Sequence, residues 1–233
     1  MPLSFILLPA MLCDAELYRA QVESLGDALI FPVAETSLAE AARSVLRQAP
    51  SRFALAGTSA GGNLALEIVA HAPERVAGLW LMGANPGPSA DPEGARRQSE
   101  RVRAGEFDAV VDELAARMLH RDGPRSAEAE ATFRRMAHRA GPEGFVRQNA
   151  AMITRRDRWH ALDEVHVPTL LLWGRHDQFS SVERATAIAA RVASARLIVL
   201  EDCGHLPTLE HPEACTGAAR EWLRQCREAA GAD

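Results

Sequence analysis

The fold is decided by the segment Phe53-Ala-Leu-Ala-Gly-Thr-Ser-Ala-Gly-Gly62, in which a turn of small residues joins an apolar run to a helical one. The apolar run at 53–56 predicts a buried strand, and residues 63–71 have the spacing of a helix. The turn matches Gly-x-Ser-x-Gly, the pattern that places a serine on a sharp bend between a strand and a helix. Glycines suit this bend because the serine backbone is strained and the helix passes close to the strand. We therefore expect Ser59 to be a nucleophile at a strand end.

Short apolar runs alternate with helical segments on both sides of this turn. Strands are predicted at residues 5–8, 28–33, 53–56, 76–82, 169–173 and 196–201, and helices at about 16–25, 37–50, 63–71, 181–192 and 212–225. Such alternation predicts an α/β fold in which helices cover both faces of a mostly parallel sheet of about six strands. Ligands of such open, doubly wound sheets bind beyond the carboxyl ends of the strands. Catalytic residues are therefore expected to follow strands.

The alternation is interrupted after Met82 by a loop and a long stretch rich in Ala, Arg and Glu. This stretch predicts a helical cap at residues 86–166, inserted into a core formed by residues 1–85 and 167–233. Its many arginines could suggest a pocket for anionic substrates. Acidic residues are about as numerous there, however, so we interpret most of these charges as solvated helix faces.

A serine hydroxyl needs a general base and, usually, an acid that orients the base. Asp177 follows the fifth predicted strand and His205 follows the sixth, which gives the chain order Ser, Asp, His that is typical of this architecture. We predict that His205 is the base and Asp177 the orienting acid. Two other acids remain as alternatives: Asp202, in the same loop as His205, and Asp91, after the fourth strand.

The composition excludes several classes of function. All 26 basic residues are Arg, which removes Schiff-base chemistry, pyridoxal phosphate attachment and a phosphate-binding loop with its lysine. The formal net charge of −5 shows no basic excess, so nucleic acid is not expected as a partner. The four cysteines have neither metal-ligand spacing nor the density of a secreted scaffold, which favours buried, reduced thiols and a cytoplasmic protein. No apolar run is long enough for a membrane span.

The contexts of Gly57–Gly61, Gly174–Asp177 and Gly204–Pro212 resemble those of the α/β-hydrolase superfamily, and within it small bacterial carboxylesterases and enol-lactonase-like hydrolases. The resemblance covers nearly the whole chain. It implies that the first strand lies between the second and the third. By position, it also implies an oxyanion hole formed by the backbone amides of Met11 and Ala60.

One departure from this resemblance concerns the loop after the first strand, where Pro9-Ala10 replaces the usual His-Gly. Backbone donors survive such changes. We therefore expect a serine hydrolase that cleaves a small or medium carboxylic ester through an acyl-enzyme, with no metal or organic cofactor. The alternatives are a lyase or carbon–carbon hydrolase that uses the same residues for proton abstraction, and a ligand receptor without turnover. A monomer or a small homo-oligomer is expected.

Overall fold

The computed structural model describes residues 3–231 and contains one sheet of six strands, all parallel to their neighbours. The strands are β1 (Ser4–Leu8), β2 (Leu29–Ile30), β3 (Phe53–Thr58), β4 (Val76–Met82), β5 (Thr169–Gly174) and β6 (Ala195–Leu200). Their order in the sheet is β2-β1-β3-β4-β5-β6, so the first strand lies between the second and the third, as the resemblance implied. The expected α/β-hydrolase architecture is confirmed. The outermost residues of the predicted core, 1–2 and 232–233, lie outside the described residues.

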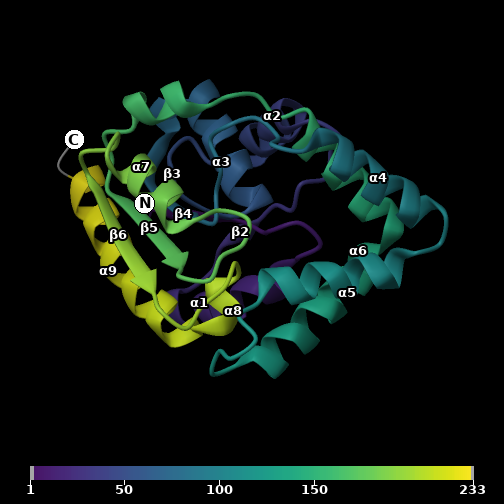
Figure 1. The fold of residues 1–233 in the computed structure, drawn as a ribbon. Coiled ribbons are helices and arrows are strands. Elements are labelled where there is room, and N and C mark those ends of the chain that lie inside the picture. The colour runs from purple at the N-terminus through teal and green to yellow at the C-terminus, as the bar shows by residue number, and fades with distance from the viewer. Residues whose placement is uncertain (1–2, 232–233) are drawn as a thin grey trace.

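Helices cover both faces of this sheet (Figure 1). They are α1 (Arg19–Leu25), α2 (Leu38–Gln48), α3 (Ala60–His71), α4 (Pro92–Arg103), α5 (Phe107–Met118), α6 (Ser126–Ile153), α7 (Val182–Ala189), α8 (Pro207–Glu210) and α9 (Pro212–Gly231), with 3₁₀ turns η1 (Ala15–Tyr18), η2 (Pro73–Arg75) and η3 (Trp159–Glu164). Helices α1 and α9 pack on one face of the sheet, while α2, α3 and α7 pack on the other. Among residues 3–231, no helix is both long and apolar enough to cross a membrane.

Neighbouring residues of each central strand enter different hydrophobic clusters. Along β1, Leu7 joins the cluster under α9 and Ile6 joins the cluster under α3. Both side chains are fully buried, which explains why the strands are continuous apolar runs rather than alternating ones. All four cysteines are buried and free, in agreement with the sequence analysis.

The helical insertion consists of α4, α5 and α6, which lie together at the right of Figure 1. Helix α6 is interrupted at Gly141, whose φ of 70° is not helical, and Pro142 starts the second half. Apolar side chains such as Leu114 and Phe133 belong to the same cluster as the sheet residue Leu7, so the insertion packs onto the core. Its exact limits, 86 and 166, stay a prediction.

Strand β2 is shorter than the prediction of 28–33. It lies at the edge of the sheet and pairs only with β1. Pro32 has no N–H to donate to a ladder, and Leu29 is 42% exposed. The apolar run therefore overstated the length of this strand.

Candidate active site

Ser59, the predicted nucleophile, lies on the turn between β3 and α3. Its φ of 55° and ψ of −114° are rare for a residue with a side chain. The Ser59 amide donates to the carbonyl of Met82 at 2.8 Å, and the Ser59 carbonyl accepts from the amide of Asn63 at 2.9 Å. The sheet and the helix therefore fix the strained backbone from both sides.

The glycines of this turn are required by close approach of backbone to backbone. A Cβ at Gly61 would lie 1.9 Å from the carbonyl oxygen of Leu8, and a Cβ at Gly57 would lie 2.3 Å from the carbonyl oxygen of Gly61. Both distances are far below van der Waals contact. The steric reason for the Gly-x-Ser-x-Gly pattern is thus visible in the structure.

His205 and Asp177 bond each other, and each comes from a loop that follows a strand. The Nδ1 atom of His205 lies 2.7 Å from Oδ2 of Asp177, and both side chains are 1% exposed. The other carboxylate oxygen, Oδ1, accepts from the amides of Phe179 and Ser180 at 2.8 and 3.0 Å. A carboxylate held in this way favours the tautomer with the proton on Nδ1. The Nε2 atom of His205 is buried and has no partner among the described residues, so it can accept a proton.

A cavity of about 420 Å³ lies between the sheet and the insertion. Met11, Ser59, Ala60 and His205 all line it. The amide of Met11 makes no hydrogen bond with a described residue, and Ala60 is the first residue of α3, where amides lack a partner within the helix. Both predicted donors are therefore available to a ligand. Four of the five predicted site residues line one cavity, and the fifth, Asp177, bonds His205.

The loop after β1 is held by a side chain of the insertion. Leu12 has a φ of 61°, and its amide donates to Oε1 of Gln148 at 2.8 Å. Gln148 in turn donates through Nε2 to the carbonyl of Val33 at 3.2 Å. Gln148 was not singled out from the sequence, because nothing along the chain connects it with a loop more than 130 residues away.

Neither alternative acid takes the place of Asp177. Asp91 directly precedes α4 and accepts from the amide of Gly94 at 2.8 Å, as a helix N-cap does. The backbone carbonyl of Asp202 accepts from Nε2 of His211 at 2.9 Å. The carboxylate that bonds the His205 ring is that of Asp177.

A buried carboxylate that the sequence analysis missed supports the loop around His205. Glu210, 1% exposed, accepts from the amides of Gly204 (2.8 Å), Leu206 (3.1 Å) and His120 (2.8 Å). The amide of His205 itself donates to the carbonyl of Met118, at the end of α5, at 2.6 Å. The loop around His205 is thus bonded both to α8, through Glu210, and to the end of α5 in the insertion.

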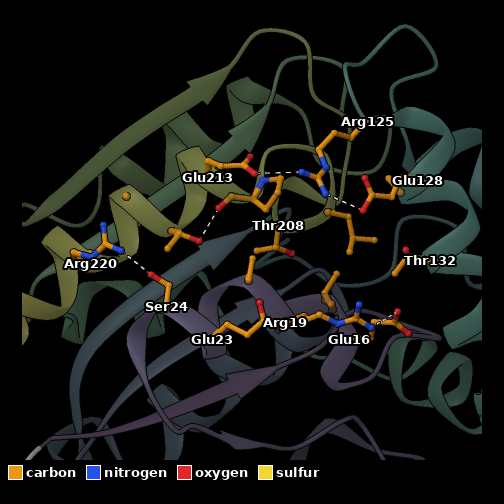
Figure 2. Close-up of a pocket in the computed structure, with 17 residues that line it drawn as sticks. Glu16, Arg19, Glu23, Ser24, Arg125, Glu128, Thr132, Thr208, Glu213 and Arg220 are labelled. Carbon is orange, nitrogen blue, oxygen red and sulfur yellow. Dashed lines mark hydrogen bonds and ion pairs between the residues drawn. The ribbon is translucent and has the colours of Figure 1, made fainter.

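A second cavity, of about 600 Å³, lies among α1, the start of α6, α8 and α9. Figure 2 shows that each arginine of its lining has a partner there: Arg125 lies between Glu128 and Glu213, Arg19 bonds Glu16, and Arg220 bonds Ser24. Its lining contains no histidine and no cysteine. The cavity that contains Ser59 and His205 is therefore the candidate active site.

Comparisons with known proteins agree with the fold. A thermophilic esterase from Thermogutta terrifontis, solved with malate bound, superposes with a TM-score of 0.86 at 28% identity and covers 97% of this chain and 90% of its own. The enol-lactonase of Burkholderia xenovorans LB400 shares the fold, with a TM-score of 0.83, 20% identity and coverage of 95% and 92%. The pimeloyl-(acyl-carrier protein) methyl ester esterase of Aromatoleum aromaticum is 27% identical over 194 residues, which are 78% of each chain.

A hydrolase from Escherichia coli, named for 2-hydroxy-6-oxononadienedioate and 2-hydroxy-6-oxononatrienedioate, is 27% identical over 171 residues, 70% of this chain and 59% of its own length. The model of the alpha/beta hydrolase family matches residues 12–218, which include the serine turn and the loops of Asp177 and His205. The chain therefore belongs to the alpha/beta hydrolase family.

Proposed function

We propose that this protein hydrolyses small or medium carboxylic esters through an acyl-enzyme on Ser59. His205 removes the hydroxyl proton through Nε2 as Ser59 attacks the ester carbonyl, and then delivers that proton to the leaving alcohol. Asp177 holds the ring and stabilises its charged form. Water, activated by the same ring, releases the acyl group.

The observation that carries this proposal is that one ring nitrogen of His205 has a hydrogen-bond partner in the protein and the other has none among the described residues. Nδ1 is bound to a buried carboxylate, while Nε2 is buried without a protein partner beside the cavity that Ser59 lines. Such a ring can take a proton from a hydroxyl in that cavity. The amides of Met11 and Ala60 would bind the oxyanion, and each donor is worth roughly 3 to 4 kcal/mol of barrier. No step requires a metal or a cofactor.

The names of the similar proteins support ester hydrolysis, because two of them are esterases. The Escherichia coli relative favours a second candidate, hydrolysis of a carbon–carbon bond by the same residues. The four buried, unpaired cysteines fit a reducing compartment such as the cytoplasm.

The test is the activity of Ser59→Ala on p-nitrophenyl acetate and butyrate. We expect kcat to fall by about 10⁴-fold or more, because the nucleophile and its base act as a unit. A fluorophosphonate probe should label wild type at Ser59 and leave the folded variant unlabelled. Turnover by Ser59→Ala at the wild-type rate would refute the proposal. Mass spectrometry separates the two candidates, because only the ester mechanism with a trapped acyl group adds acyl mass to Ser59.

A further inference from the structure

The cavity that contains Ser59 is lined by two arginines of the insertion, Arg117 at the end of α5 and Arg155 just after α6. Within residues 3–231, neither guanidinium forms an ion pair with a carboxylate. The one Asp or Glu on the lining is Asp91, whose Oδ1 caps α4. The lining therefore carries two guanidinium groups and one carboxylate, so positive charge is in excess there.

Arg155 is the more confined of the two. Its Nε donates to the carbonyl of Gly87 at 3.0 Å, Nη2 to that of Pro88 at 3.1 Å, and Nη1 to that of Met152 at 3.5 Å. These three carbonyls fix the plane of the guanidinium but bring no formal charge. Two of its five N–H donors remain without an acceptor among the described residues. Burial, and then the like charge of Arg184, lower the pKa of Arg155.

Arg158, three residues further along the same segment, is by contrast paired with a carboxylate. Its Nε and Nη2 atoms each donate to one oxygen of the buried Glu67 carboxylate, both at 2.7 Å. Half of the arginines in residues 86–166, among them Arg101 and Arg134, also form ion pairs with acids. The half-buried guanidinium of Arg155 bonds only carbonyls, although desolvating a charge is costly unless it is paired with an opposite charge.

Arg117 adds charge close to the base. Its guanidinium lies 4.4 Å from the centre of the Phe179 ring, and that ring is 4.9 Å from the ring of His205. Arg117 is exposed, so solvent screens its charge more than that of Arg155. Its position nevertheless favours the same kind of ligand.

We propose that the ester bound in this cavity carries a carboxylate on its acyl chain, and that Arg155 binds this carboxylate. The inference rests on the proposed function and adds its substrate class, a half-ester of a dicarboxylic acid. The two free N–H donors of Arg155 would donate to the two carboxylate oxygens, and such paired N–H···O bonds are the arrangement in which guanidinium groups bind carboxylates most strongly. A volume of about 420 Å³ is within the range of pockets for small ligands.

The test compares mono-p-nitrophenyl adipate with p-nitrophenyl hexanoate, two esters whose acyl chains have six carbons and differ in a terminal carboxylate. The readout is the ratio of their kcat/KM values. Wild type should prefer the adipate, and this preference should weaken as salt is added. Arg155→Gln should lower the ratio at least tenfold, mainly through KM. Arg155→Lys, which keeps the positive charge, should retain part of the preference for the adipate.

Arg156→Gln is the matched control, because Arg156 is the exposed neighbour and does not line the cavity that contains Ser59. It should leave the ratio at the wild-type value. If Arg155→Gln lowers both kcat/KM values equally, Arg155 is only a clamp for the loop at Gly87 and the inference is wrong. A wild-type ratio of one or less also overturns it, even if Arg155→Gln does not fold. Turnover of the hexanoate that depends on Ser59 would then leave the proposed function intact, whereas turnover of neither ester would remove both.

Discussion

Replacing Glu210 by Gln should destabilise the fold and disorganise the loop that carries His205. In the best arrangement, the amide oxygen of Gln takes the place of Oε2 and keeps the bonds from the amides of Gly204 and His120. The amide nitrogen then faces the amide of Leu206, which loses its acceptor. One lost hydrogen bond to a charged group and one buried N–H without a partner together cost about 2–4 kcal/mol.

This cost is a large part of the free energy of unfolding of a typical protein, about 5–15 kcal/mol. It corresponds to a decrease in Tm of about 4–16 °C for a chain of this size. Urea unfolding followed by circular dichroism measures the change. A displacement of the ring by about 1 Å is enough to lower the rate by about 10²-fold. With p-nitrophenyl butyrate, kcat should therefore fall more than KM changes.

Glu213→Gln is the control for this prediction, because the Glu213 side chain is 81% exposed and its ion pair with Arg125 is 3.2 Å long. Exposed pairs contribute about 0–1 kcal/mol. If the free energy of unfolding of Glu210→Gln lies within about 0.5 kcal/mol of that of Glu213→Gln, the three amide contacts of Glu210 do not contribute to stability as argued.

Two further predictions concern other parts of the structure. Hydrogen bonds from Arg135 and Arg139 hold the pKa of Glu16 at about 2, below its usual 4.5. These contacts therefore stabilise the fold above pH 4.5 and are lost as the pH falls towards 2. Glu16→Gln should lower the free energy of unfolding by about 1–2 kcal/mol at pH 7, after screening by solvent. The difference in unfolding free energy between wild type and Glu16→Gln should narrow as the pH falls from 4.5 to 2, and a constant difference would contradict the lowered pKa of Glu16. Gly61→Ala should abolish labelling of Ser59 by the fluorophosphonate and lower Tm, since its Cβ would collide with the carbonyl of Leu8; labelling at the wild-type rate would show that the turn tolerates a side chain.

The sequence predicted the parts of the fold that depend on local pattern. Val76–Met82 was predicted with its observed bounds, because a parallel strand buried on both faces is a continuous apolar run. Ser59, Asp177 and His205 could be predicted to lie at one edge of the sheet because each follows a strand, and parallel strands end at the same edge.

Other features depend on contacts between distant segments and could not be predicted. The charge of Arg155 looked like that of any other arginine of the insertion until the structure showed that Arg158 bonds Glu67 and Arg155 does not. Glu210 could have been a solvated helix residue, and only its burial against three amides reveals its role. The overlong prediction for β2 has a similar origin, because an apolar run does not reveal that its strand lies at the edge of the sheet.

The tie between α5 and the loop of His205 has a consequence for the proposed mechanism. The carbonyl of Met118 and the amide of His120 act as a tether on that loop, one directly and the other through Glu210. A swing of the whole insertion away from the sheet would have to break this tether and release the imidazole from its place. In the proposed mechanism, such a movement would therefore displace the general base.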